Sequence, residues 1–121
     1  MLKLADVIEA LTGIKPEHAS LVISEAVIDS RQVIPGSMFV ALPGERVDGH
    51  DYLESAFKSG AAFALVQKDM SQQVKTIQIN DVSAINFDTL QQPFCIQVSD
   101  TLKSLQAVAK FWRSKLPLKA I

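Results

Sequence analysis

The segment of this chain with the clearest potential for anion binding is Gly-Glu-Arg-Val-Asp-Gly at residues 44–49. Its two glycines have the spacing of a Walker loop, in which a lysine and then a serine or threonine come next to contact the phosphates and Mg²⁺. Here the next residues are His50 and Asp51, and an aspartate at that position would repel a triphosphate. We therefore do not expect this segment to bind ATP.

The same segment could still bind a less highly charged anion. Arg46 carries a forked donor suited to phosphate oxygens, and a helix beginning near Gly49 would add free backbone N–H groups. Ser30 and Arg31, at a predicted strand end, could supply a hydroxyl and a second guanidinium. Gly44 and Gly49 would let a ligand approach the backbone closely. The alternative is structural: a solvated Arg46, an Arg31 paired with a nearby carboxylate, and glycines that only form turns.

The two histidines do not indicate a metal site or a general base. Asp48, His50 and Asp51 are close in sequence, but Asp48 is well suited to cap a helix, with Asp51 as the acid of a capping box. A metal site would need a further ligand from a distant part of the chain. The only other histidine, His18, lies beside Glu17 in a polar loop and does not indicate one. No nucleophile accompanies His50 in the pattern. We predict no metal and no catalytic residue, and we interpret His50 as structural or ligand-contacting.

Hydrophobic periodicity indicates the helices and strands that hold these residues in place. Helical spacing appears in residues 4–11, 53–57 and 102–112, and glycines end the first two segments. The last of these carries a predicted core stripe, Leu102, Leu105, Ala109 and Trp112, after a cap at residues 99–100. Runs typical of strands are residues 22–28 with a possible interruption at 24–25, and residues 38–42, 61–66, 76–79 and 94–98. Residues 80–93 are predicted to be loop. The alternation predicts an α/β fold with a mixed, partly parallel sheet flanked by helices.

Composition narrows the classes of function. The 121 residues fit a single domain, and a formal net charge of -1 without a basic stripe argues against a nucleic-acid partner. The lone Cys95 cannot form an internal disulfide and is expected to be a buried thiol. Asp6 comes before any signal-peptide apolar stretch, and no apolar run is long enough to cross a bilayer. We expect a cytoplasmic protein without membrane insertion.

Several blocks together resemble the first domain of the Mur ligases. The resemblance covers nearly the whole chain and is weak only between about residues 67 and 93. The block at residues 44–52 is most similar to members that add D-alanyl-D-alanine (MurF-type), with members that add the third residue (MurE-type) as the alternative. Tyr52 stands where phenylalanine is more usual. The blocks are Asp-Ser-Arg at 29–31, residues 36–42, residues 44–52, the segment from Ala56 to Val66, and Val-Ser-Asp-Thr-Leu at 98–102.

The resemblance implies a division of labour between domains. In this family the first domain binds the UDP-N-acetylmuramoyl peptide, a central domain binds ATP and Mg²⁺, and a third binds the incoming amino acid or dipeptide. Residues 1–121 would form one N-terminal domain that anchors the UDP end of UDP-N-acetylmuramoyl-tripeptide for D-alanyl-D-alanine addition. It would have no cofactor of its own. The residues expected to bind the substrate are Ile28 and Ser30 at the uridine end, Glu45, Arg46 and Val47 in the nucleotide loop, and Arg31, Asp48, Gly49 and His50 beside them.

The last residues of the sequence also resemble a segment of this family. Residues 119–121 resemble the beginning of the strand that precedes the Walker loop of the family. The resemblance therefore implies that the central and third domains are absent from this chain, which alone would be inactive as an ATP-dependent amide-forming ligase. Two other interpretations stay open: a stand-alone nucleotide-binding or regulatory module, and an α/β domain that binds a protein partner without a small ligand.

Overall fold

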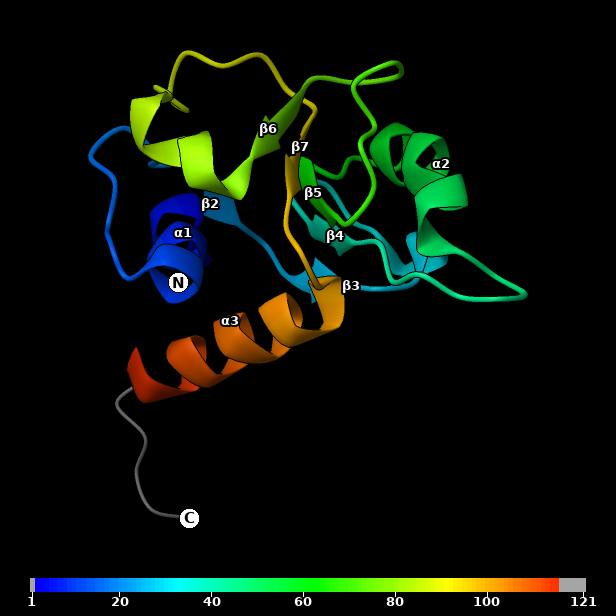
Figure 1. Ribbon diagram of the computed structural model, residues 1–121, viewed down its shortest axis with the longest axis horizontal. Helices are drawn as coiled ribbons and strands as arrows, with labels where there is room; N and C mark the ends of the chain where they lie inside the picture. The colour runs from blue at the N-terminus through cyan, green and yellow to red at the C-terminus, as the bar shows by residue number, and fades with distance from the viewer. Residues whose placement is uncertain (1, 116–121) are drawn as a thin grey trace.

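A computed structural model describes residues 2–115, and the expected strand beginning at residues 119–121 lies outside the described residues. The centre of the fold is a five-stranded sheet in the order β3-β4-β5-β7-β6, in which every neighbouring pair is parallel (Figure 1). The strands are β3 (Ala26–Val27), β4 (Met38–Val40), β5 (Phe63–Val66), β6 (Thr76–Gln78) and β7 (Phe94–Gln97).

The central strands are buried on both faces, as the continuous apolar run at residues 61–66 predicts. Successive side chains of a strand point to opposite faces, so β5 contributes Phe63 to one hydrophobic cluster and Ala64 to the other. On the first face Phe63 stacks on Phe94 of β7, with 5.4 Å between ring centroids. Helices α1 (Leu4–Thr12) and α3 (Thr101–Lys115) cover that face, and α2 (Leu53–Lys58) covers the other (Figure 1).

Antiparallel pairing is confined to a small separate sheet. β1 (Leu2–Lys3) pairs antiparallel with β2 (Val22–Ile23), and the chain then passes through residues 24–25 into β3. The predicted interruption therefore separates two strands that belong to different sheets. The predicted α/β fold with a partly parallel sheet flanked by helices is confirmed, and the parallel pairs gather in the five-stranded sheet. Sequence periodicity does not reveal β1, because two residues are too few to show alternation.

Helix α3 is rotated relative to the predicted stripe. Leu102 and Ala109 are exposed, whereas Thr101, Ser104 and Val108 are buried. The hydroxyl of Thr101 donates to the carbonyl of Ala41 at 2.8 Å, and this bond allows a polar side chain to be buried there. Of the predicted stripe, Leu105 and Trp112 still pack partly against the core.

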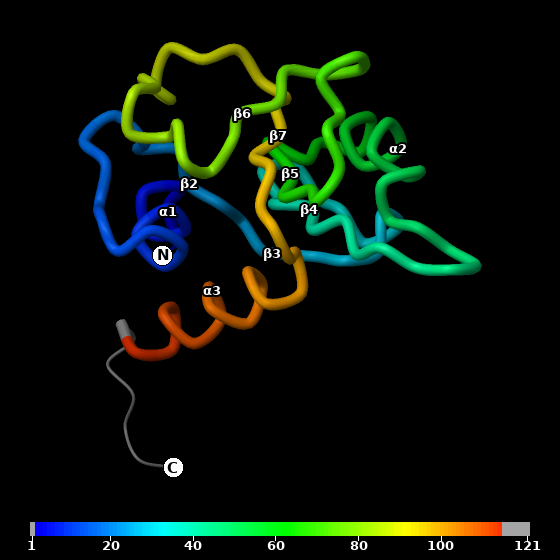
Figure 2. The backbone as a smooth tube through the Cα atoms, viewed as in Figure 1, coloured from blue at the N-terminus to red at the C-terminus, as the bar shows by residue number. Residues whose placement is uncertain are grey.

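Short 3₁₀ segments connect the longer elements. Asp48 caps η2 (Gly49–Tyr52) by accepting from the His50 backbone N–H at 3.0 Å, and α2 begins only afterwards, at Leu53. The segment predicted as loop after β6 begins with η3 (Ile79–Ala84). The trace in Figure 2 shows the loop after β4 projecting from the body of the molecule before it enters α2. Within residues 2–115, no helix has the length and apolar character that a membrane crossing would need.

Candidate functional site

A cavity of about 540 Å³ lies at the carboxyl ends of two neighbouring parallel strands. The chain leaves β3 through η1 (Ser30–Gln32) and leaves β4 through a loop that we call the 42–49 loop. Because parallel strands end at the same edge of a sheet, the two segments face each other across the cavity. The lining residues are Ile28, Asp29, Ser30, Arg31, Phe39, Leu42, Val47, Gly49 and Tyr52.

The wall of this cavity includes large apolar side chains that are accessible to solvent. Ile28, Val47 and Tyr52 keep 51%, 64% and 44% of their surface exposed, and all three line the cavity. Exposed large apolar side chains that cluster in a concave surface indicate a site for binding. Ser30, in contrast, is buried at the first position of η1 and is one of the residues that line the cavity.

The two arginines predicted to bind an anion differ in their surroundings. Arg31 forms a two-pronged ion pair with Asp29, with Nη2 2.8 Å from Oδ2 and Nε 3.1 Å from Oδ1. The hydrogen bond from Arg31 lowers the pKa of Asp29, and Asp29 in turn raises the pKa of the guanidinium. Arg46 makes no ion pair or hydrogen bond through its side chain with any residue between 2 and 115. The structural alternative therefore describes Arg31, and the exposed, unpaired Arg46 is compatible both with that alternative and with contact to a ligand.

His50 is buried, and both of its ring nitrogens are occupied. Nδ1 lies 2.7 Å from Oδ1 of Asp48, and Nε2 accepts from the backbone N–H groups of Gln67 at 2.9 Å and Lys68 at 3.3 Å. An acceptor at Nε2 places the proton of the neutral ring on Nδ1, which donates to Asp48. Asp48 also pairs with the Lys68 ammonium, and this bond, followed by those from His50, lowers the pKa of Asp48 well below its usual range.

The two glycines of the 42–49 loop are required by the packing of the chain itself. A Cβ at Gly44 would lie 2.2 Å from the carbonyl oxygen of Val47. A Cβ at Gly49 would lie 2.7 Å from the backbone nitrogen of Leu42, whose carbonyl accepts the Gly49 N–H at 2.8 Å. The position that a Cβ would take is thus filled by neighbouring backbone at both glycines, while Gly49 also lines the cavity; close approach of a ligand to these glycines stays a prediction.

The structure brings together only part of the predicted set. Ile28, Ser30, Arg31, Val47 and Gly49 line the cavity. Glu45 and Arg46 are exposed at the tip of the 42–49 loop, and Asp48 and His50 attach its end to the sheet. Sequence reasoning did not select Asp29, Phe39, Leu42 and Tyr52, which also line the cavity. Asp29 lies between the selected Ile28 and Ser30, and Tyr52 lies two residues after the selected His50; this proximity was their available signal.

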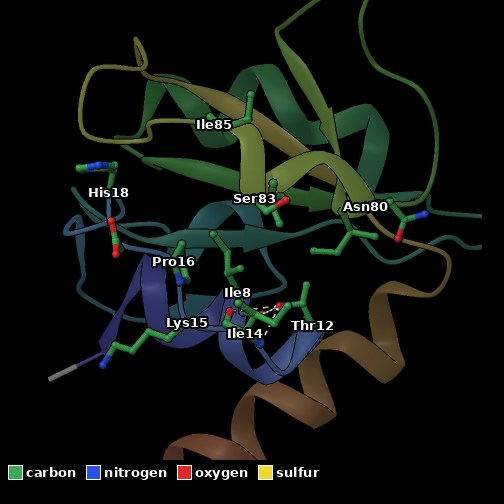
Figure 3. A pocket seen from close by; sticks show the side chains of 12 residues that line it. Ile8, Thr12, Ile14, Lys15, Pro16, His18, Asn80, Ser83 and Ile85 are labelled. Atoms are coloured by element: carbon green, nitrogen blue, oxygen red, sulfur yellow. Dashed lines mark hydrogen bonds between the residues drawn. The ribbon is translucent and has the colours of Figure 1, made fainter.

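A second cavity, of about 400 Å³, lies between the end of α1 and η3 (Figure 3). Its lining includes Ile8, Thr12 and Ser83, and none of the residues predicted to bind the substrate. Among residues 2–115, no three histidine, cysteine, aspartate or glutamate side chains gather closely enough to hold a metal ion.

Comparison with known proteins shows which family this chain is similar to. Residues 22–113 match the family described as Mur ligase family, catalytic domain. A UDP-N-acetylmuramoyl-tripeptide--D-alanyl-D-alanine ligase of Treponema pallidum is 34% identical over 89 residues, which cover 74% of this chain and 18% of that protein. A UDP-N-acetylmuramoyl-L-alanyl-D-glutamate--2,6-diaminopimelate ligase of Vibrio parahaemolyticus is 38% identical over 78 residues, which cover 64% of this chain and 16% of that protein.

A solved structure extends the similarity to the fold. MurF from Acinetobacter baumannii superposes with a TM-score of 0.57 at 20% identity, covering 92% of this chain and 21% of that one. The parallel sheet flanked by helices is therefore shared with that protein. This chain matches less than a fifth of the length of the two sequence relatives.

Proposed function

Because this chain belongs to the Mur ligase family, we propose that residues 1–121 form the domain that binds the UDP end of a UDP-N-acetylmuramoyl peptide. By their names, the two sequence relatives are ligases of such peptides. Holding the nucleotide end positions the distant peptide carboxylate for amide formation, a contribution of binding and orientation rather than of bond making.

The observation that carries this proposal is the convergence of Ile28, Ser30, Val47 and Gly49 on one cavity. The accessible apolar walls suit the faces of a base and its ribose, and the Ser30 hydroxyl can donate or accept a hydrogen bond. A pyrophosphate needs a cation, and Arg46 is unpaired within residues 2–115 on the loop that borders the cavity.

In this role the chain supplies no group to the reaction itself. We propose that ATP and Mg²⁺ are bound by other domains of the ligase, since the segment at 44–49 lacks the lysine and hydroxyl of a triphosphate loop. The block at 44–52 favours D-alanyl-D-alanine addition to the tripeptide, with the MurE-type reaction as the alternative, and relatives of both kinds match. The proposed location is the cytoplasm.

A titration of the 121-residue chain tests the proposal. We expect saturable binding of UDP and of UDP-N-acetylmuramoyl-tripeptide by calorimetry, with NMR shift changes concentrated at Ile28, Ser30 and Val47. Arg46→Ala should weaken binding about tenfold, because a charge-assisted hydrogen bond contributes about 1.4 kcal/mol or more. Lys58→Ala removes another exposed cation, one paired only with Glu54 on α2, and should bind like the unaltered chain.

Other results of this titration would favour one of the alternative functions. No saturable binding at millimolar concentrations of either ligand would contradict the proposal and leave a domain that binds a protein partner. Equal affinity for UDP and ADP would favour a general nucleotide-binding module. Binding that is unchanged in both Arg46→Ala and Ser30→Ala would refute this site while leaving the family membership intact.

A further inference from the structure

We propose that His50 is a positioning residue, which holds the 42–49 loop in the conformation that presents Arg46 and Val47 to the ligand. This inference rests on the proposed function for the identity of the ligand. It concerns a side chain that lies outside the cavity lining and acts through the loop.

The two ends of the 42–49 loop meet through the hydrogen bond from the Gly49 N–H to the Leu42 carbonyl, 2.8 Å long. The backbone just before the loop is held by Ala41, whose N–H donates to Leu65 of β5 and whose carbonyl accepts from the Thr101 hydroxyl. The beginning of the loop is therefore attached to the sheet and to α3, whereas its end needs an attachment of its own.

His50, the residue after Gly49, provides that attachment. Its side chain is 2% exposed and turns toward the end of β5, where Nε2 accepts the consecutive N–H groups of Gln67 and Lys68. These amides come directly after the last residue of the strand, Val66. His50 thus joins the end of the loop to the carboxyl edge of the sheet across 17 residues of sequence.

The chemistry of this contact requires a neutral imidazole. The ring must accept at Nε2 and donate at Nδ1, and a lysine, an arginine or an ionised carboxylate cannot do both. Asp48 accepts from Nδ1 and is itself paired with Lys68, so the ring orientation is fixed from both sides. A loop held in its binding conformation loses less conformational entropy when the ligand binds.

Two substitutions separate the roles of the two nitrogens. His50→Asn keeps an amide donor near the position of Nδ1 but loses the acceptor for Gln67 and Lys68. His50→Gln can return an acceptor near the position of Nε2. We expect His50→Asn to speed hydrogen exchange of the Gln67 and Lys68 amides at least about tenfold and to weaken UDP binding about five- to tenfold, with His50→Gln recovering much of both. His18→Asn, which changes the exposed second histidine, is the matched control and should alter neither.

A spectroscopic measurement on the unaltered chain keeps the inference falsifiable if the variants fold poorly. The imidazole ¹⁵N shifts of His50 should show a protonated Nδ1 and a bare Nε2. A proton on Nε2, or a His50→Asn variant with unchanged exchange and unchanged UDP affinity, would overturn the inference. Absence of UDP binding by the unaltered chain would instead sink the proposed function, while the tautomer and exchange rates still decide whether His50 holds the loop.

Discussion

At the scale of single residues, the partner of each charge decides what it can bind. Arg31 and Arg46 are equivalent in a sequence, but Asp29 accepts from Nε and Nη2 of the first, and the second is unpaired within residues 2–115. Asp48 similarly serves as acceptor for the backbone and ring of His50 and for Lys68. Its carboxylate is therefore part of the support of the loop, and we do not assign it a direct contact with substrate.

The pKa of Asp48 makes a prediction about acid stability. A carboxyl whose pKa is lowered by folding stabilises the protein fully above its ordinary value of 3.8, and this contribution is lost as the pH falls toward the folded-state pKa. Asp48→Asn keeps the cap and the acceptor but loses the charge. Between pH 6 and pH 3, the unfolding free energy of the unaltered chain should fall by about 1 kcal/mol more than that of Asp48→Asn, allowing for solvent screening of Lys68.

Urea unfolding at a series of pH values measures this difference. Lys68→Gln is the companion variant and should reduce the same pH dependence, because the Lys68 bond is the largest cause of the shift. If the unaltered chain and Asp48→Asn lost stability in parallel, the ion pair would have no role in folding stability.

At the scale of elements, the site depends on junctions where strands end. Thr101, the first residue of α3, connects this helix to two strand ends through Ala41 and Gln67. The 42–49 loop depends on backbone packing that leaves no room for a side chain at Gly49. These are contacts between elements, so each can be tested by a substitution that leaves the elements themselves intact.

Thr101→Val tests the first junction. Valine has nearly the same shape but removes the hydroxyl, which leaves the Ala41 carbonyl without its donor in a buried position. We expect a loss of about 1–2 kcal/mol of unfolding free energy, measured by urea unfolding. Ser114→Ala removes a hydroxyl at the exposed end of the same helix and should cost much less. Equal stability of Thr101→Val and the unaltered chain would contradict this account of the helix orientation.

Gly49→Ala tests the second junction. The added methyl group would meet backbone atoms of Leu42 and Ala41 at 2.7 and 3.0 Å, so we expect a loss of about 2 kcal/mol and weaker ligand binding. Gly13→Ala is the comparison, because Gly13 has a φ of 81° with open space around it. That variant should lose about 1 kcal/mol through backbone strain alone and bind the ligand normally. Thermal unfolding and titration of both variants separate crowding from strain.

At the scale of the whole molecule, the parallel sheet separates two hydrophobic clusters, and a cavity lies at its carboxyl edge. Cys95 lies in β7, between β5 and β6, and is fully buried. Burial raises the pKa of its thiol to about 12, so the reactive thiolate hardly forms in the folded chain. Its reactivity therefore reports opening of the entire sheet.

Labelling of Cys95 with a disulfide reagent at pH 8 measures that opening. We expect the native chain to react at least about a thousandfold more slowly than the chain unfolded in urea, because reaction requires an opening that costs several kcal/mol. Added UDP should slow the reaction further if it binds only the folded chain. Rapid labelling in native buffer would show that β7 is less protected than its packing implies.

Features that depend on neighbouring residues could be predicted from the sequence alone. Periodicity located α1, the central strands and the alternation of helices and strands. Residue types also marked the segment at 44–49 as unsuited to a triphosphate, and its binding of a less highly charged anion stays a prediction. Strand pairing and burial depend on residues far apart in the chain, so they became known only from the tertiary structure. It made β3 and β4 neighbours, which brings Ile28 to Val47, and it placed the ring of His50 against Gln67. Local patterns carry no information on these contacts, because each is fixed by how the elements pack.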